Sequence, residues 1–138
     1  ILPDRYCQHT RTAAALQVLE ASQPGDLLVI PVQLGLHHRG RSTRRATAVM
    51  LEPEFGLGAF AGGCATLTHS ERFVRWEQLH MDLPGDEFAP DAGGQFSRAP
   101  ILGHDGGRLE FGAYDVGGAN ARYGSASGLV PQPSDPRN

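Results

Sequence analysis

The hydrophobic pattern at the start of the chain predicts one helix followed by one short strand. Residues 12–21, TAAALQVLEA, are rich in Ala and Leu, and their apolar positions recur at helical spacing. Pro24 and Gly25 do not continue a helix, so we expect the helix to end before them. The apolar run LLVIPV at 27–32 then predicts a buried strand, which Pro31 places at a sheet edge or a strand end.

Two helical patterns follow, one on each side of Pro53. Ser42 or Thr43 is suited to cap a helix that runs to about Leu51, because a hydroxyl accepts hydrogen bonds from the first free N–H groups. The second pattern covers residues 55–67 and predicts a buried helix that packs closely through its glycines. Its large apolar side chains are expected to face the core: Leu57, Phe60, Cys64 and Leu67.

A capping box predicts one more helix in the middle of the chain. Thr68 and Glu71 have the Thr-x-x-Glu spacing, with Thr68 as the cap of a helix that ends near Glu77. Such a helix places Phe73 and Trp76 on one side. We expect Trp76 to pack in the core, which is the commoner role of a lone tryptophan among apolar residues.

In the second half of the chain the hydrophobic period becomes strand-like. Residues 78–83 alternate between apolar and polar. Residues 99–103 and 108–115 are two further strand patterns around HDGG, and they predict a hairpin with Asp105 and Gly106 at its turn. The side chains expected to face inward from the second of these strands are Leu109, Phe111 and Ala113.

This distribution of elements predicts an α+β fold. At 138 residues, one domain is expected, and a chain of this size can bury a core without a metal or a disulfide. We expect a single globular domain over residues 1–130, in which a small antiparallel sheet is packed by helices from the N-terminal half. Residues 131–138, PQPSDPRN, are expected to form a disordered C-terminal tail.

Composition excludes some kinds of site. The sequence contains no Lys, so all 12 basic residues are Arg. Catalysis through a lysine Schiff base and a Walker-type phosphate loop are therefore excluded, because both need a lysine amine. The formal net charge is −3, so a basic field over the whole domain is not expected.

Positive charge is nevertheless concentrated in the segment HHRGRSTRR at 37–45, which no acidic residue interrupts. A solvated loop and helix start is the simple interpretation. Cations oppose the dipole at a helix start, however, and Arg forks beside free N–H groups suit an anion. We therefore expect binding of nucleic acid or a phosphorylated ligand. The expected binding residues are His37, His38, Arg39, Arg41, Arg44 and Arg45.

The stretch QLHMDLPGDE supports an alternative, enzymatic function. On a strand, His80 and Asp82 project to the same face, and the following turn leads to Asp86 and Glu87. An imidazole beside carboxylates suits acid–base catalysis or a shared divalent metal, so a small hydrolase or isomerase is the alternative prediction. The simpler interpretation is a polar strand face and an ordinary turn. A non-catalytic assembly module is a third alternative, because the Gly-rich segment permits close packing.

Cysteine usage and hydropathy give an expected location. Cys7 and Cys64 form no metal-binding motif. One disulfide between them is the alternative for an exported protein, but two buried, reduced thiols are the commoner case and the one we expect. No apolar run approaches the roughly 20 residues that a membrane helix needs. The first residues also lack the basic and apolar regions of a secretory signal. We therefore expect a cytoplasmic protein.

Overall fold

The computed structural model describes residues 5–72, 78–91 and 93–132, and it places three α-helices and nine strands within them. Of the expected tail at 131–138, the last six residues lie outside the described ranges. The helices are α1 (Thr10–Ser22), α2 (Thr43–Val49) and α3 (Ala59–Thr68), with two 3-10 helices, η2 (Leu36–His38) and η3 (Ser70–Arg72). The strands are β1 (Tyr6–Gln8), β2 (Val32–Gln33), β3 (Glu54–Gly56), β4 (His80–Asp82), β5 (Asp86–Phe88), β6 (Arg98–Asp105), β7 (Arg108–Asp115), β8 (Tyr123–Ser125) and β9 (Ser127–Leu129).

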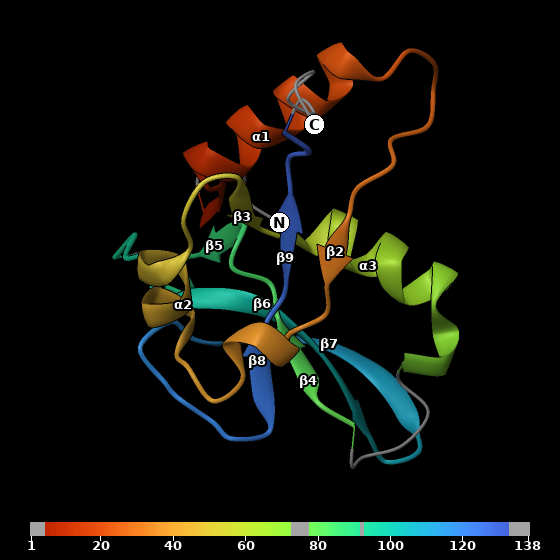
Figure 1. Cartoon of the computed structure of the whole chain (residues 1–138). Coiled ribbons are helices and arrows are strands. Elements are labelled where there is room, and N and C mark those ends of the chain that lie inside the picture. Colours follow the sequence, from red (N-terminus) through yellow and green to blue (C-terminus); the bar gives the residue numbers. More distant parts are fainter. Residues whose placement is uncertain (1–4, 73–77, 92, 133–138) are drawn as a thin grey trace.

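The strands form two sheets, one of six strands and one of three (Figure 1). The larger sheet has the order β1-β5-β6-β4-β8, and β7 pairs with β6 along its whole length. β4 is antiparallel to β6 but parallel to β8. In the smaller sheet, β9 lies between β2 and β3. The α+β class is confirmed, although the sheet is larger than expected and mixed rather than antiparallel.

A single residue joins the two sheets. β8 ends at Ser125 and β9 begins at Ser127, so Ala126 separates a strand of the larger sheet from a strand of the smaller one. The N–H of Ala126 donates to the Asp82 carbonyl, and the Ala126 carbonyl accepts from the N–H of Leu57. Backbone hydrogen bonds therefore fix the two sheets to each other at this point.

The hydrophobic core takes residues from α1 and from both sheets. The predicted helix at 12–21 is confirmed as α1, which buries Thr12, Ala15 and Leu19 on one face. The Thr12 hydroxyl donates to the Gly56 carbonyl at 2.8 Å, so the buried polar group of this face has a partner in β3. The other buried members of the core are Phe55, Leu57, Met81, Leu83, Leu102 and Ala126.

α3 confirms the second predicted helix but presents the opposite face to the core. Phe60 is 87% exposed and Leu67 is 82% exposed, whereas Gly62 and Thr66 are buried. The physical reason is a close approach to the sheet, because a Cβ at Gly62 would lie 2.4 Å from Cδ2 of Leu83. A face of small residues lets the helix pack more closely than its large side chains would, and those side chains stay in solvent. The predicted close packing through small residues is therefore confirmed, whereas the expected burial of the apolar face with Phe60 and Leu67 is wrong.

The expected buried strand at 27–32 is largely an exposed extended segment. Val32 belongs to β2, but Leu27 is 86% exposed and Val29 is 72% exposed. The Gln23 side chain donates to the Val29 carbonyl and accepts from the Val29 N–H, both at 2.8 Å. The side-chain amide of Gln23 thus satisfies the N–H and the carbonyl of Val29, as the backbone of a neighbouring strand would. The segment therefore needs neither a partner strand nor burial at this point.

Thr68 is the last residue of α3 and not the cap of a new helix, and the described residues of the predicted helix include the 3-10 helix η3, while 73–77 lie outside the described ranges. α3 continues to Thr68, whose hydroxyl donates back to the Cys64 carbonyl at 2.9 Å. This bond is the usual alternative for a threonine in the last turn of a helix, and it replaces the predicted cap. Phe73 and Trp76, and with them the predicted core position of Trp76, lie outside the described residues.

β6 and β7 form the predicted hairpin, with its turn one position later than expected. Gly106 and Gly107 are the two turn residues, with φ of 55° and 82°. A two-residue hairpin turn favours positive φ at both positions, which glycine adopts without strain. Leu109 is 44% exposed and Phe111 is 63% exposed, so their predicted inward orientation is wrong.

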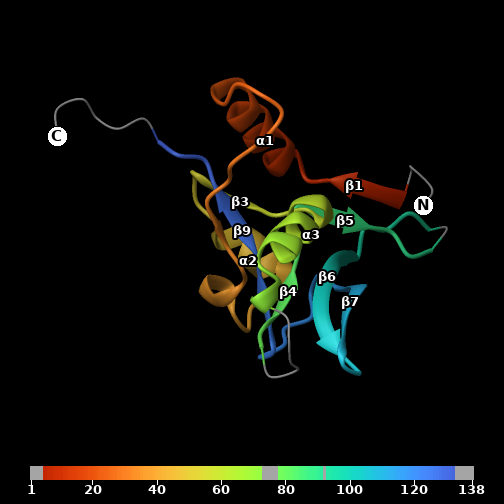
Figure 2. The same cartoon turned by 90° about the vertical axis from the view of Figure 1, so that its right-hand side faces the viewer.

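The helices lie on different sides of the strands. α2 and α3 flank β9 from opposite sides (Figure 1). α1 lies at the end of the molecule away from the β6–β7 hairpin (Figure 2). The basic segment, which runs into the first turn of α2, and α3 therefore lie on different sides of β9.

Two observations concern the expected thiols and membrane contact. Cys7 and Cys64 are both free, but both are exposed, so the expectation of buried thiols is wrong. None of the helices in the described ranges has the length and apolar character needed to cross a membrane.

Candidate anion-binding site

The arginine segment, residues 37–45, is fixed to β8 by its backbone. Arg39 forms an antiparallel bridge with Gly124, and the N–H of Gly40 donates to a β8 carbonyl at 2.9 Å. Just before the segment, Gly35 has a φ of 101° and packs on Gly124, where a Cβ would lie 2.6 Å from the carbonyl oxygen. Only glycine allows this backbone conformation and approach without strain. The sheet therefore sets the positions from which the arginine side chains leave the backbone.

The four arginines of the segment, Arg39, Arg41, Arg44 and Arg45, are all exposed. Arg39 Nε donates to a backbone carbonyl at 3.0 Å, and Arg41 Nη1 donates to His38 Nδ1 at 2.8 Å. Within the described ranges, no carboxylate forms an ion pair with any of the four. Their charge is therefore not neutralised by an acid of the described chain, and guanidinium groups in this state are suited to phosphate or carboxylate.

The first N–H groups of α2 are already used, which corrects part of the expected geometry. Of the two predicted caps, Ser42 is the N-cap, and its Oγ accepts from the N–H of Arg45 at 3.3 Å. The N–H of Arg44 donates to the Val116 carbonyl at 2.9 Å. Because both groups have acceptors within the chain, an anion would be held by guanidinium groups and not by these N–H groups.

The two histidines of the segment have different environments. His37 is exposed, whereas His38 is 1% exposed and does not form part of the arginine surface. Arg41 can only donate, so His38 Nδ1 must be the acceptor of their bond. His38 therefore carries its proton on Nε2, which donates to Glu54 Oε1 at 2.8 Å.

Glu54 lies at the centre of a polar network beneath the arginine segment. The Ser127 hydroxyl donates to Glu54 Oε1, and Gln33 Nε2 donates to Ser127 Oγ at 2.8 Å. Burial by itself raises the pKa of Glu54, but hydrogen bonds from Ser127 and His38 outweigh it and leave the pKa below its ordinary value. The network thus holds an ionised carboxylate against a buried imidazole.

The predicted pair of His80 and Asp82 is buried in the larger sheet, with each residue 2% exposed. The two side chains share a face of β4, where His80 pairs with Tyr123 and Asp82 pairs with Ser125. Asp82 Oδ1 and Ser125 Oγ are buried without a hydrogen-bond partner among the described residues. Burial raises the pKa of Asp82 to about 7. The pair is therefore not the exposed polar strand face that the simpler interpretation expected.

Asp86 and Glu87 lie on β5 and have other contacts. Asp86 is 3% exposed, and its carboxylate accepts from the Tyr6 hydroxyl and from the N–H of Ala59. It therefore caps the start of α3 and ties this helix to β1. Glu87 is half-buried and pairs with Cys7 of β1. The structure does not bring these two carboxylates and the β4 pair into one group of metal ligands among the residues it describes.

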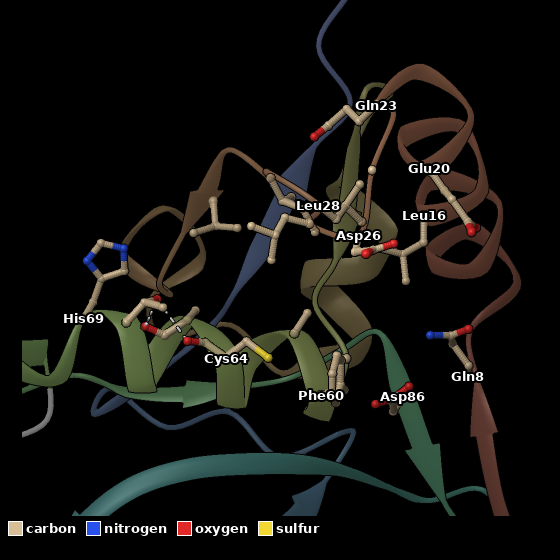
Figure 3. Close-up of a pocket in the computed structure, with 18 of the residues that line it drawn as sticks. Gln8, Leu16, Glu20, Gln23, Asp26, Leu28, Phe60, Cys64, His69 and Asp86 are labelled. Carbon is tan, nitrogen blue, oxygen red and sulfur yellow. Dashed lines mark hydrogen bonds between the residues drawn. The ribbon is translucent and has the colours of Figure 1, made fainter.

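An apolar groove of about 1140 Å³ lies between α1, the 23–32 segment and α3. Phe60 and Cys64 project into it from α3, opposite Leu16 and Leu28 (Figure 3). The groove is the surface that the reversed orientation of α3 leaves open, and the predicted core position of Cys64 is wrong for the same reason. The arginines of the segment do not line it.

Comparisons of the chain with protein-family models, with curated proteins and with solved structures find no match. Its function therefore has to be inferred from its own geometry. Two neighbouring features carry recognisable chemistry, the arginine surface and the histidine–carboxylate network beneath it.

Proposed function

We propose that the protein binds an anionic partner that carries phosphate groups, nucleic acid or a phosphorylated ligand, through the arginine segment. The supporting observation is that its four exposed arginines have no carboxylate partner within the described ranges. Four such charges repel one another, and a bound anion would relieve that repulsion while accepting paired N–H bonds. The residues that would bind are Arg39, Arg41, Arg44 and Arg45.

The charge of the whole chain limits the expected affinity. A formal net charge of −3 opposes long polyanions, so the attraction has to come from the local surface. Each phosphate contact releases counterions, which makes such binding steeply dependent on salt. We therefore expect binding at low salt that weakens strongly as salt is raised.

The test is fluorescence anisotropy with labelled mixed-sequence RNA and DNA over a series of salt concentrations. Replacing Arg44 and Arg45 together by Ala should weaken binding and reduce the slope of log K against log salt by about 2, because two phosphate contacts are lost. The matched control replaces Arg98 and Arg108 by Ala. Both control arginines are exposed on β6 and β7, so the control changes the net charge equally at another surface.

The outcomes are distinct. Loss in the Arg44/Arg45 variant and not in the control supports the proposal, whereas absence of binding at low salt, or equal loss in both variants, rejects it. Competition by tripolyphosphate separates the two kinds of ligand. Strong competition indicates a compact phosphorylated ligand, and weak competition indicates an extended nucleic acid.

The two alternatives have weaker support. A hydrolase or isomerase that uses His80, Asp82, Asp86 and Glu87 would act through side chains that are mostly buried, and Asp86 already caps α3. An assembly module would need a surface for a partner, and the groove beside Phe60 offers an apolar one. The arginine surface is favoured over both because its charged groups are accessible and uncompensated by described acids.

A further inference from the structure

Three donor groups meet beneath the arginine segment. His37, His38 and Glu54 each offer one nitrogen or oxygen atom, and these atoms all lie within 4.8 Å of one another. Two imidazoles and one carboxylate form a ligand set that Zn²⁺ uses, and Fe²⁺ also accepts such a set. We propose that these three residues bind a divalent transition metal, Zn²⁺ being the best suited, in competition with Arg41.

The ligands are held by groups around them. Gln33 Oε1 accepts from the N–H of Gly35 at 2.8 Å and from the N–H of His37 at 3.2 Å, which fixes the turn that carries both histidines. The Ser127 hydroxyl donates to the Glu54 carboxylate and orients it. Outer partners of this kind fix the direction of ligands in known metal sites.

The distance between His38 and Glu54 needs only a small adjustment to admit an ion. His38 Nε2 and Glu54 Oε1 are 2.8 Å apart across their hydrogen bond. Two atoms that bind a tetrahedral Zn²⁺ at their usual distances lie about 3.4 Å apart. The pair therefore has to open by roughly half an ångström, and the ion takes the place of the proton between the two atoms.

Arg41 opposes this exchange. Its Nη1 donates to His38 Nδ1 at 2.8 Å, and the contact requires a lone pair on Nδ1. If Nε2 binds a metal, a neutral imidazole carries its proton on Nδ1, which can no longer accept from Arg41. The exposed Arg41 side chain then has to turn into solvent. The Arg41-bound and metal-bound states of His38 therefore exclude each other.

The test measures Zn²⁺ binding by isothermal titration calorimetry and Co²⁺ binding by visible absorption, on protein without an affinity tag. Cys7 and Cys64 are exposed thiols that would bind zinc themselves, so all samples carry Cys7→Ser and Cys64→Ser. The test variants are His37→Ala and Glu54→Gln. The control is His69→Ala, an exposed histidine that lies 3.6 Å from Glu71 and represents an ordinary surface site.

We expect one Zn²⁺ per chain and a loss of affinity of at least about tenfold in each test variant, with no change in the control. His37 is exposed, so its replacement should not unfold the protein, and circular dichroism checks this. Absence of saturable binding would overturn the proposal. So would equal affinity in His37→Ala and the parent protein, or a loss that occurs only in His69→Ala.

A second pair of variants tests the competition. Arg41→Ala should bind Zn²⁺ more tightly than the parent, because His38 Nδ1 is released. Arg45→Ala removes the same charge, but Arg45 makes no described contact with His38. A larger gain in Arg41→Ala supports the competition, and equal gains would show that charge alone is responsible and overturn it. These outcomes do not depend on the proposed anion binding, because the metal ligands are other side chains.

Discussion

Two histidine–carboxylate pairs in this protein behave in opposite ways. Glu54 accepts hydrogen bonds from His38 and from Ser127, and its pKa lies below the ordinary value. Asp82 lies on the same strand as His80, is surrounded by the sheet, and has its pKa raised to about 7 by burial. The same two residue classes therefore favour an ionised carboxylate in one place and a protonated one in the other, depending on whether donors offset the loss of water.

The difference follows from how each pair is assembled. His80 and Asp82 are two positions apart on β4, so their Cα atoms are about 6.6 Å apart and the strand by itself makes no contact between their side chains. His38, Glu54 and Ser127 come from η2, β3 and β9, and the fold brings their polar atoms into direct contact. The spacing of His80 and Asp82 in the sequence thus places them on one face of a strand, whereas the folding of distant segments joins His38, Glu54 and Ser127 by hydrogen bonds.

The largest expected effect that tests this contrast is a pH dependence of stability due to Asp82. The pKa of its carboxyl is about 7 in the fold, against 3.8 for an unperturbed aspartate, so the folded state binds more protons between these values. The free energy of unfolding should therefore fall as pH rises from about 4 to about 7, by at most roughly 4 kcal/mol. Asp82→Asn should remove most of this slope.

Urea unfolding at several pH values measures the slope of each protein. Asp26→Asn is the matched control, because Asp26 is exposed and should not alter the slope. A parent protein whose stability does not fall over this range would contradict the assigned burial effect. The same holds if Asp82→Asn keeps the full slope.

A smaller loss of stability is expected when Glu54 is removed from its hydrogen-bond network with His38 and Ser127. Glu54→Ala leaves the His38 Nε2–H and the Ser127 hydroxyl without their acceptor, which should cost about 2–4 kcal/mol of stability. Glu54→Gln keeps one acceptor oxygen and should cost less. Denaturant midpoints at pH 7 compare the two variants, and equal midpoints for Glu54→Ala and the parent would show that the network adds nothing to stability.

The smallest expected effect is the acid response of Glu54, which has the opposite sign to that of Asp82. Because its pKa is lowered from 4.5, it contributes stability above that value and loses it as pH falls through the folded pKa. An Asp82→Asn background removes the competing slope, so adding Glu54→Gln should flatten the loss that remains as pH falls below the ordinary value of 4.5. Unchanged acid unfolding in the double variant would contradict the lowered pKa.

Several elements were predictable because their signals are local. The Ala- and Leu-rich pattern identified α1, Ser42 was one of the two residues expected to cap α2, and HDGG marked the β6–β7 hairpin with its turn placed one position early. Caps, helix formers and turn residues act within a few positions of the chain, so a single sequence is enough to recognise them.

Orientation was less predictable because it depends on distant partners. The sequence of α3 favours burial of Phe60 and Leu67, but Leu83 contacts the helix where Gly62 stands, and this contact decides the face. The parallel pairing of β4 with β8 also joins segments about 40 residues apart, for which neither segment carries a local signal.

In the candidate site, too, the features with a local signal were predicted and those that depend on distant contacts were not. The arginine segment was recognisable as a run of like charges, and its four arginines are exposed as expected. Glu54 and Ser127 were not identified as part of the site, because they are distant in sequence from the residues they contact. Glu54 stands 16 positions from His38, and Ser127 stands 73 positions from Glu54. The only local indication for Glu54 was its position as a charged residue next to the apolar Phe55. That position does not indicate which residues Glu54 contacts.

β9 is the last of the described strands to be synthesised, yet it is the strand with which both β2 and β3 pair. Within the described ranges these two strands pair with β9 and not with each other. Ser127 follows Glu54 by 73 positions, so a growing chain holds two unpaired strand edges until that length has been added. The smaller sheet therefore forms only after most of the domain has left the ribosome. Until then, the unpaired edges and the apolar residues at 27–29 are available to pair with another copy.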